Sequence, residues 1–189
     1  MTDENRLAAN LADDLDGHFE HLVRAFQDRL YGFALRLTRS PEEAEECAQD
    51  AFVRAYRALD AYPRERRRAL RLRPWLYQIT LNVVRNRVRH KMPLSVALDG
   101  VVSDRLVADD ASARPEAAAL DREGWQRMKR ALDDLPLRYR TAVVLRHVQG
   151  LSYAEAAEVL DQPVGTTKSD VHRGLRLLRE ALEPEGVLI

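Results

Sequence analysis

The sequence predicts an all-α protein of two small helical domains, joined by an acidic extended linker. Three observations lead to this fold class. Apolar residues recur at three- and four-residue steps over long stretches, and strand-like alternation is scarce. The 189 residues include only 8 Gly and 8 Pro, so long helices are seldom interrupted. An apolar share of 46% can supply packed cores, and the length suits two small domains.

The predicted segments follow one another without an internal repeat. The first seventeen residues are polar and acidic without a clear period, so we expect a flexible N-terminal tail. The segment after the first domain shows no strong period, is acidic and is followed by Pro115, as expected for a linker. The full division is 1–17 tail, 18–91 first helical domain, 92–114 acidic linker, 115–182 second helical domain and 183–189 C-terminal tail.

Two helices are predicted at the start of the first domain. The first covers residues 18–38 and carries apolar residues at helical spacing. The second begins after Ser40 as N-cap, with Pro41 at the first helical position and Glu43 completing a capping box. One face of this helix is apolar and includes Cys47. The opposite face is acidic, which fits either a solvated surface or a protein-docking surface.

An arginine-rich stretch and a basic helix complete the first domain. From residue 64 to residue 91 there are ten Arg and Lys residues against the single acid Glu65. Residues 62–73 are predicted as a loop or short helix, and Pro74 opens the next helix. Amide and guanidinium groups fall on one stripe of that helix, at steps of four, three and four: Gln78, Asn82, Arg85 and Arg89. Such groups hydrogen-bond base edges and phosphates, although an ordinary basic helix face has the same composition.

The second domain begins with a helix whose core residues are expected to be Trp125, Met128, Ala131, Leu132 and Leu135. Both tryptophans, Trp75 and Trp125, stand at core spacing and are interpreted as packing residues. A new helix is predicted from the Leu135–Pro136 step, with residues 143–145 buried.

The stretch 150–179 is typical of a helix-turn-helix. Ser152 and Glu155 form a capping box for the first helix, and Pro163 ends the turn. The second helix starts at Gly165 and is basic, with polar residues Lys168, Ser169, His172, Arg173, Arg176 and Arg179. A basic second helix favours insertion into a DNA groove, the alternative being a helical hairpin with a solvated basic face.

Composition and motifs exclude several functional classes. The net charge is +0, but basic and acidic residues are concentrated in separate segments. A basic segment can bind nucleic acid even when the whole chain is neutral, so this function is not excluded. Neither a glycine-rich phosphate loop nor a nucleophile with a partner is visible, so no enzyme, cofactor or metal is expected. His18 and His21 lie three residues apart but have only Cys47 to complete a zinc site. One cysteine, a missing signal peptide and the lack of a membrane-length apolar run predict a cytoplasmic protein.

Three blocks of the chain are similar to a known family. They read SPEEAEECAQDAFVRAYRAL from Ser40, RPWLYQITLNVVRNRVRH from Arg73, and LPLRYRTAVVLRHVQGLSYAEAAEVLDQPVGTTKSDVHRGLRLLRE from Leu135. In this order they resemble regions 2.1–2.2, 2.3–2.4 and 4 of bacterial sigma-70 factors. The chain is identified as a member of their extracytoplasmic-function group, over roughly residues 18–182.

The resemblance implies partners and roles for exposed residues. A sigma factor of this group binds core RNA polymerase, through its β′ clamp and β subunit, and promoter DNA. It is usually held inactive by an anti-sigma factor. Core-polymerase binding would fall to Gln49, Asp50 and Arg54. The melted −10 element would be contacted by Asn82, Arg85, Asn86 and Arg89, with Arg66 and Arg68 in the base-capture loop. The −35 element would be read by Lys168, Ser169, His172, Arg173 and Arg176.

Three departures from the family pattern bear on specificity. The base-capture loop reads RERRRALRLR in place of a glycine, small polar residues and aromatics. The recognition helix reads GTTKSD rather than GTVKSR, so Asp170 is expected to bring a carboxylate near the DNA surface, where it repels phosphate or accepts from a cytosine amino group. Ala156 replaces a bulky aliphatic residue, which would loosen the hairpin.

Two other functions are weighed against this one. A free-standing helix-turn-helix regulator explains the second domain equally well, but it leaves the basic helix after Pro74 and the acidic linker unexplained. It also predicts a sensor domain or dimer surface, and neither is visible in the sequence. A helical adaptor that binds only protein does not explain the basic stripe on the helix after Pro74 or the basic face of the helix that starts at Gly165.

Overall fold

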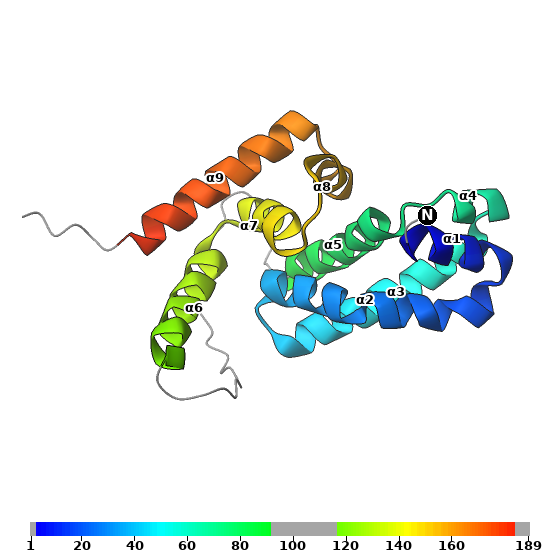
Figure 1. Ribbon diagram of the computed structural model, residues 1–189, viewed down its shortest axis with the longest axis horizontal. Helices are drawn as coiled ribbons and strands as arrows, with labels where there is room; N and C mark the ends of the chain where they lie inside the picture. Colours follow the sequence, from blue (N-terminus) through cyan, green and yellow to red (C-terminus); the bar gives the residue numbers. More distant parts are fainter. Residues whose placement is uncertain (1–2, 92–116, 184–189) are drawn as a thin grey trace, which may run out of the picture.

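The computed structural model describes residues 3–91 and 117–183 (Figure 1). All regular structure in these two ranges is helical, which confirms the predicted fold class. The predicted linker 92–114 and residues 184–189 of the predicted C-terminal tail lie outside the described residues. The helices are α1 (Asp3–Asp13), α2 (Leu15–Thr38), α3 (Pro41–Ala61), α4 (Arg64–Arg68), α5 (Leu72–Lys91), α6 (Ala117–Asp134), α7 (Leu137–Val143), the π-helix η1 (Val144–Val148), α8 (Tyr153–Leu160) and α9 (Val164–Leu182).

The N-terminal segment is a helix, so the prediction of a flexible tail is wrong over residues 3–13. Ala8 and Leu11 of α1 are buried in the main core, and α1 packs against α2 and α4. Short helices with few apolar residues gain most of their stability from packing, which the local sequence does not reveal. Asp14 then caps α2 by accepting a hydrogen bond from the Gly17 amide (3.0 Å), so α2 starts three residues earlier than predicted.

The first bundle is built around α2, α3 and α5, which lie alongside one another (Figure 1). The predicted N-cap of α3 is present, because the Ser40 hydroxyl accepts from the Glu43 amide at 3.3 Å. Cys47 is fully buried on the inner face of α3, as predicted. Phe33 of α2 meets Tyr77 of α5 edge-to-face, with ring centroids 5.1 Å apart. These contacts turn the outer faces of α3 and α5 toward solvent.

The second group of helices consists of α6, α7, η1, α8 and α9. It contains the predicted helix-turn-helix in α8 and α9. Both bonds of the capping box are present, from the Glu155 amide to the Ser152 hydroxyl (3.2 Å) and from the Ser152 amide to the Glu155 carboxylate (2.8 Å). The turn is made by Asp161, which adopts a left-handed conformation with φ of 53°. Residues 143–145 are buried as predicted.

Two residues expected in the core of the second domain are on its surface. Trp125 is 69% exposed and Met128 is 43% exposed, so the prediction that they pack inside is wrong. Their helix α6 packs on α9, and Ala131 near its end and Leu135 just after it are buried. The apolar spacing along α6 is helical, yet it did not distinguish buried Ala131 from exposed Trp125 and Met128.

The crossing of α9 over α7 depends on Gly174. A Cβ atom at this position would lie 2.6 Å from a methyl group of Val143 and 3.3 Å from the Tyr139 carbonyl. We expect Gly174→Leu to lower the unfolding free energy by about 1–3 kcal/mol, because the added side chain overpacks this crossing. Thermal unfolding followed by circular dichroism measures the change. Gly165→Ala on the same helix is the control, since nothing lies within 4 Å of its Cβ position and its stability should not fall.

The two groups of helices share one core. Buried residues of the first bundle and of α7, η1, α8 and α9 form a single hydrophobic cluster. Helix α8 packs on α5, while α2 touches α7 and η1. The second group is therefore seated directly on the first bundle, with α8 between α9 and α5 (Figure 1).

Candidate nucleic-acid interface

Helix α9 presents a polar face to solvent and an apolar face to the protein. Val171 and Gly174 are buried on its inner side, against α7. All five residues predicted to read the −35 element are exposed: Lys168, Ser169, His172, Arg173 and Arg176. The structure therefore brings these five side chains onto one accessible face of a single helix, which is the geometry that groove reading requires.

Aromatic rings lie beside the cations of this face. The Arg173 guanidinium is 6.0 Å from the Tyr139 ring centroid, and the Lys168 ammonium is 5.7 Å from that of Tyr153. Arg146 approaches the same Tyr153 ring at 5.0 Å. A cation held near a ring loses less conformational freedom when it binds a phosphate or base. Sequence reasoning missed the two tyrosines, because each contact to α9 joins residues from different helices.

Asp170 is buried and does not lie on the exposed face of α9, so the prediction that its carboxylate lies on the surface proposed for DNA is wrong. Its side chain is buried and accepts hydrogen bonds from Arg138 Nε (2.9 Å) and Gln162 Nε2 (3.2 Å). One turn further along, Gly174 lies on the same inner face, which explains why Asp170 points toward α7. The hydrogen bond to Asp170 raises the pKa of the Arg138 guanidinium. Asp170 thus ties α7, the turn and α9 together.

Helix α5 carries the residues predicted to contact melted DNA. The four predicted contacts on this helix are all exposed: Asn82, Arg85, Asn86 and Arg89. Gln78, which begins the polar stripe, instead donates to the Glu158 carbonyl of α8 at 3.4 Å. Desolvation, and then the positive charge of Arg89, lower the pKa of Arg85. In the predicted stripe, Asn82, Arg85 and Arg89 are thus exposed, whereas Gln78 is hydrogen-bonded to α8.

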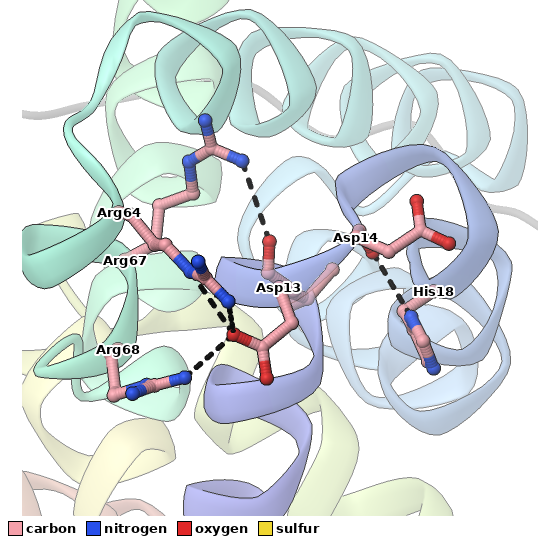
Figure 2. Close-up of polar contacts among 7 residues, drawn as sticks. Asp13, Asp14, His18, Arg64, Arg67 and Arg68 are labelled. Carbon is pink, nitrogen blue, oxygen red and sulfur yellow. Dashed lines mark hydrogen bonds and ion pairs between the residues drawn. The ribbon is translucent and has the colours of Figure 1, made fainter.

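The arginine-rich α4 is organised by a carboxylate from α1. Figure 2 shows Arg64 and Arg68 converging on Asp13, with an Arg68 Nη2 to Asp13 Oδ1 distance of 2.6 Å. The hydrogen bond from Arg64 contributes most to a lowered pKa of the Asp13 carboxyl. Arg67 donates to the carbonyl oxygens of Tyr62 (3.0 Å) and Leu11 (3.5 Å). This anchoring fixes the position of the short helix.

Arg66, a predicted DNA contact, is not part of that ion-pair cluster. Its guanidinium lies over the Tyr62 ring, 3.7 Å from the centroid, and the Tyr62 and Trp75 centroids are 6.3 Å apart. A flat guanidinium supported by aromatic rings can stack on an unpaired base. Arg68, the other predicted contact in the loop, is paired with an exposed carboxylate, which a phosphate can replace at little cost. Sequence reasoning missed Asp13 and Tyr62.

The predicted polymerase-binding residues form an exposed patch on α3. Gln49, Asp50 and Arg54 are all exposed. Between them, Val53 has an exposed fraction of 49%, which sequence reasoning did not single out although it lies one turn from Gln49. An apolar side chain framed by polar and charged groups is the usual composition of a protein-docking surface. We call these four residues the α3 patch.

Other kinds of site find little support in the part of the chain that the structure describes. His18 and His21 lie near each other, with ring centroids 5.8 Å apart, but no group of three potential metal ligands occurs among the described residues. Burial raises the pKa of the Cys47 thiol, as expected for a structural cysteine. None of the described helices is both long and apolar enough to cross a membrane.

Comparison with protein families finds two matches along the chain. Residues 22–92 match the model of sigma-70 region 2, and residues 125–178 match that of sigma-70 region 4. The first match contains the α3 patch and the α5 stripe. The second contains the exposed face of α9.

Individual relatives agree with these matches. The chain is 34% identical over 172 residues to the ECF RNA polymerase sigma factor SigW of Bacillus subtilis, covering 87% of this chain and 88% of that protein. It is 30% identical over 171 residues to the ECF RNA polymerase sigma-E factor of Escherichia coli, covering 88% and 87%.

Solved structures show the same fold. The sigma factor RpoE of Bartonella quintana, in complex with the anti-sigma factor NepR, aligns with a TM-score of 0.70 at 26% identity, covering 89% of this chain and 98% of that one. CnrH, in complex with the cytosolic domain of CnrY, aligns with a TM-score of 0.69 at 24% identity, covering 97% and 99%. Together with the two region matches, these relatives show that the chain belongs to the extracytoplasmic-function group of the sigma-70 family of RNA polymerase sigma factors.

Proposed function

We propose that this chain binds core RNA polymerase through the α3 patch and directs it to promoters with two DNA-binding surfaces. Helix α9 reads the −35 element as duplex in the major groove, while α5 and α4 hold the melted −10 element. In this role the protein is a specificity subunit without a catalytic site of its own, and it acts in the cytoplasm. The supporting observation is that the residues predicted for the three tasks are all exposed and lie on four helices, α3, α4, α5 and α9.

The chemistry of each surface suits its task. Arginine and lysine on α9 can pair with guanine edges and phosphates, and His172 and Ser169 add further hydrogen-bonding groups. Extracting a base from the stack costs a few kcal/mol, so a −10 surface needs both a hydrogen-bonding edge and a stacking surface. Asn82 and Asn86 supply amides, and the Arg66–Tyr62 stack supplies the flat surface.

An anti-sigma factor is a further proposed partner. The solved relative RpoE of Bartonella quintana, which has the same fold, is bound to the anti-sigma factor NepR. Met128 lines a shallow open groove together with Leu175, Leu178 and Leu182, and Trp125 of the same helix is 69% exposed. Exposed apolar side chains of this size are unusual on a surface that has no partner.

Arg173→Ala is expected to weaken binding of the polymerase complex to a −35-containing duplex by about 1–3 kcal/mol, because one guanidinium contact to a base edge is lost. Competition between duplexes with intact and scrambled −35 elements measures this in a gel-shift assay. Arg179→Ala, on the same helix, is the control and should have little effect. If Arg173→Ala binds both duplexes as the unmodified protein does, Arg173 is not part of the −35 surface.

The experiment that tests the whole proposal is footprinting of promoter DNA by core polymerase with and without this protein. We expect protection at two elements and hyper-reactive bases in the downstream one. Protection of a single duplex site by the protein without polymerase would instead support the free-standing regulator.

A further inference from the structure

Arg138 is a basic residue of α7 that lies beside the recognition helix α9. The two helices pack against each other (Figure 1), and Arg138 Nε donates to Asp170 Oδ2 of α9 at 2.9 Å. The surroundings of the two side chains differ, because that of Arg138 is 61% exposed and that of Asp170 is only 5% exposed. The guanidinium group thus joins a buried carboxylate to the protein surface.

The hydrogen bond to Asp170 leaves most of the donors of Arg138 unused. An arginine side chain carries five N–H donors, and the bond uses the single one at Nε. Neither Nη1 nor Nη2 has a hydrogen-bonding partner in the part of the chain that the structure describes. Because the guanidinium is planar and rigid, fixing Nε also limits the directions in which the Nη groups can point. The exposed end of Arg138 is therefore a prepared pair of charged donors, which suits a phosphate oxygen.

Asp170 is itself held in place, so it can position Arg138. Its carboxylate also accepts from Gln162 Nε2 at 3.2 Å, and the same Nε2 donates to the Thr167 hydroxyl at 3.1 Å. Thr167 is fully buried, and its hydroxyl donates to the Pro163 carbonyl oxygen at 3.3 Å. These bonds connect the turn of the helix-turn-helix with α9 and α7. The buried carboxylate is thus a fixed anchor for the guanidinium.

Arg138 lies close to a residue that we propose reads the −35 element. The Arg138 guanidinium carbon is 5.9 Å from the Tyr139 ring centroid, and that of Arg173 is 6.0 Å from the same centroid. The two guanidinium groups are therefore no farther apart than the width of the major groove, about 12 Å. Since Arg138 belongs to α7, beside the helix proposed to enter the groove, we expect its ligand to be the phosphate backbone and not a base edge.

We propose that Asp170 is a positioning residue and that Arg138, which it holds, is a further DNA contact that binds a backbone phosphate beside the −35 element. The proposal rests on the proposed function, because it adds a contact to the −35 surface of α9. It gives Asp170 an effect opposite to that of its charge, since a carboxylate by itself repels DNA. The anchor restricts the Arg138 side chain before DNA arrives, so less conformational entropy is lost on binding.

The test measures binding of the polymerase complex to two duplexes from a promoter that the protein transcribes, one with the −35 element intact and one with it scrambled. Arg138→Ala should weaken binding to both duplexes by a similar factor, about fivefold at near-physiological salt, because a phosphate contact does not depend on sequence. The slope of log affinity against log salt concentration should become less steep by about 0.9. Arg173→Ala should instead weaken mainly the binding of the intact duplex.

Asp170→Ala distinguishes positioning from charge and from folding. If charge alone matters, removal of the carboxylate raises the affinity for DNA, whereas loss of the anchor should lower it by about two- to tenfold. In the Arg138→Ala background, Asp170→Ala should weaken binding no further, because no arginine is left to position. A displaced α9 would weaken binding in both backgrounds. Circular dichroism at the assay temperature checks the fold, and Asp170→Asn, which keeps the side-chain shape, replaces Asp170→Ala if that variant unfolds.

Arg24→Ala is the matched control, and it also defines the outcome that overturns the proposal. Arg24 pairs with Glu20 on α2 and is 69% exposed, so its replacement removes the same charge outside the proposed DNA surfaces and should change neither affinity nor salt dependence. The proposal is overturned if Arg138→Ala behaves like Arg24→Ala while Arg173→Ala still weakens binding of the intact duplex. It is also overturned if Asp170→Ala weakens binding equally with and without Arg138. If Arg173→Ala has no effect either, the −35 role of α9 fails, and this proposal fails with it.

Discussion

Asp50→Arg is expected to reduce the affinity for core RNA polymerase by at least about tenfold, the largest single effect that the structure predicts for assembly. Asp50 is exposed on α3, beside Val53 and Arg54. Reversing a charge inside a docking surface places like charges opposite each other when the partner binds. Because the side chain is exposed, its replacement should leave the fold intact. Anisotropy of the labelled protein, titrated with core polymerase, measures the affinity, and circular dichroism checks the helices.

Asp60→Arg provides the matched control. Asp60 is exposed on the same helix, and it lies ten residues from Asp50, outside the α3 patch. Its replacement makes the same charge change and should leave the affinity for polymerase near that of the unmodified protein. Equal losses in the two variants would mean that α3 responds only to overall charge. An unchanged affinity of Asp50→Arg would remove the α3 patch from the polymerase interface.

The second large effect concerns promoter opening. Asn82→Ala should reduce the fraction of open complexes by roughly tenfold or more, while duplex binding changes little. The amide of Asn82 is exposed on α5, where it can hydrogen-bond the edge of an extracted base. Losing that bond removes stabilisation that exists only once the duplex has melted. Duplex binding persists because it depends on α9.

Two readouts distinguish these steps in the polymerase complex. Permanganate reactivity of unpaired thymines reports opening, and a gel shift on ice reports initial binding. Gln27→Ala, an exposed amide on α2 outside both surfaces, should change neither. If Asn82→Ala weakens both steps equally, the placement of the −10 contacts on α5 is incorrect.

Local signals in the sequence predicted the starts of the helices that carry the proposed sites. The capping residues Ser40, Ser152 and Glu155 mark helix starts by bonds to amides only three residues away, so short-range spacing was sufficient. The exposed face of α9 also followed from helical periodicity. These features depend on neighbours within one or two turns.

Long-range packing accounts for the predictions that were wrong. Asp170 was placed on the outer face of α9, yet it pairs with Arg138, which lies 32 residues away along the chain. Trp125 stands at core spacing on α6, but its side chain is 69% exposed. Helix α1 was missed because its stability comes from contacts to α2 and α4. Arg138 is remote in sequence from Asp170, as α4 is from α1, and periodicity carries no information about such contacts.

At the candidate site too, local features were predicted from the sequence and long-range contacts were not. The sequence blocks proposed residues of α5 and α4 as nucleic-acid contacts, but they did not reveal the carboxylates that the arginine-rich stretch meets. Asp13 reaches Arg68 from 55 residues away, and Glu158 reaches Arg71 from 87 residues away. Both carboxylates come from helices that no spacing rule places beside the arginine-rich stretch.

Run-off transcription tests the central claim most directly. Core RNA polymerase from the protein's own host is supplied with a fragmented genomic library from that host, with and without the full chain. The account predicts discrete new transcripts that depend on the protein and whose upstream regions share two elements. If folded protein that binds duplex DNA yields no such transcripts with the host core enzyme, the account of this chain as a promoter-specificity subunit is contradicted.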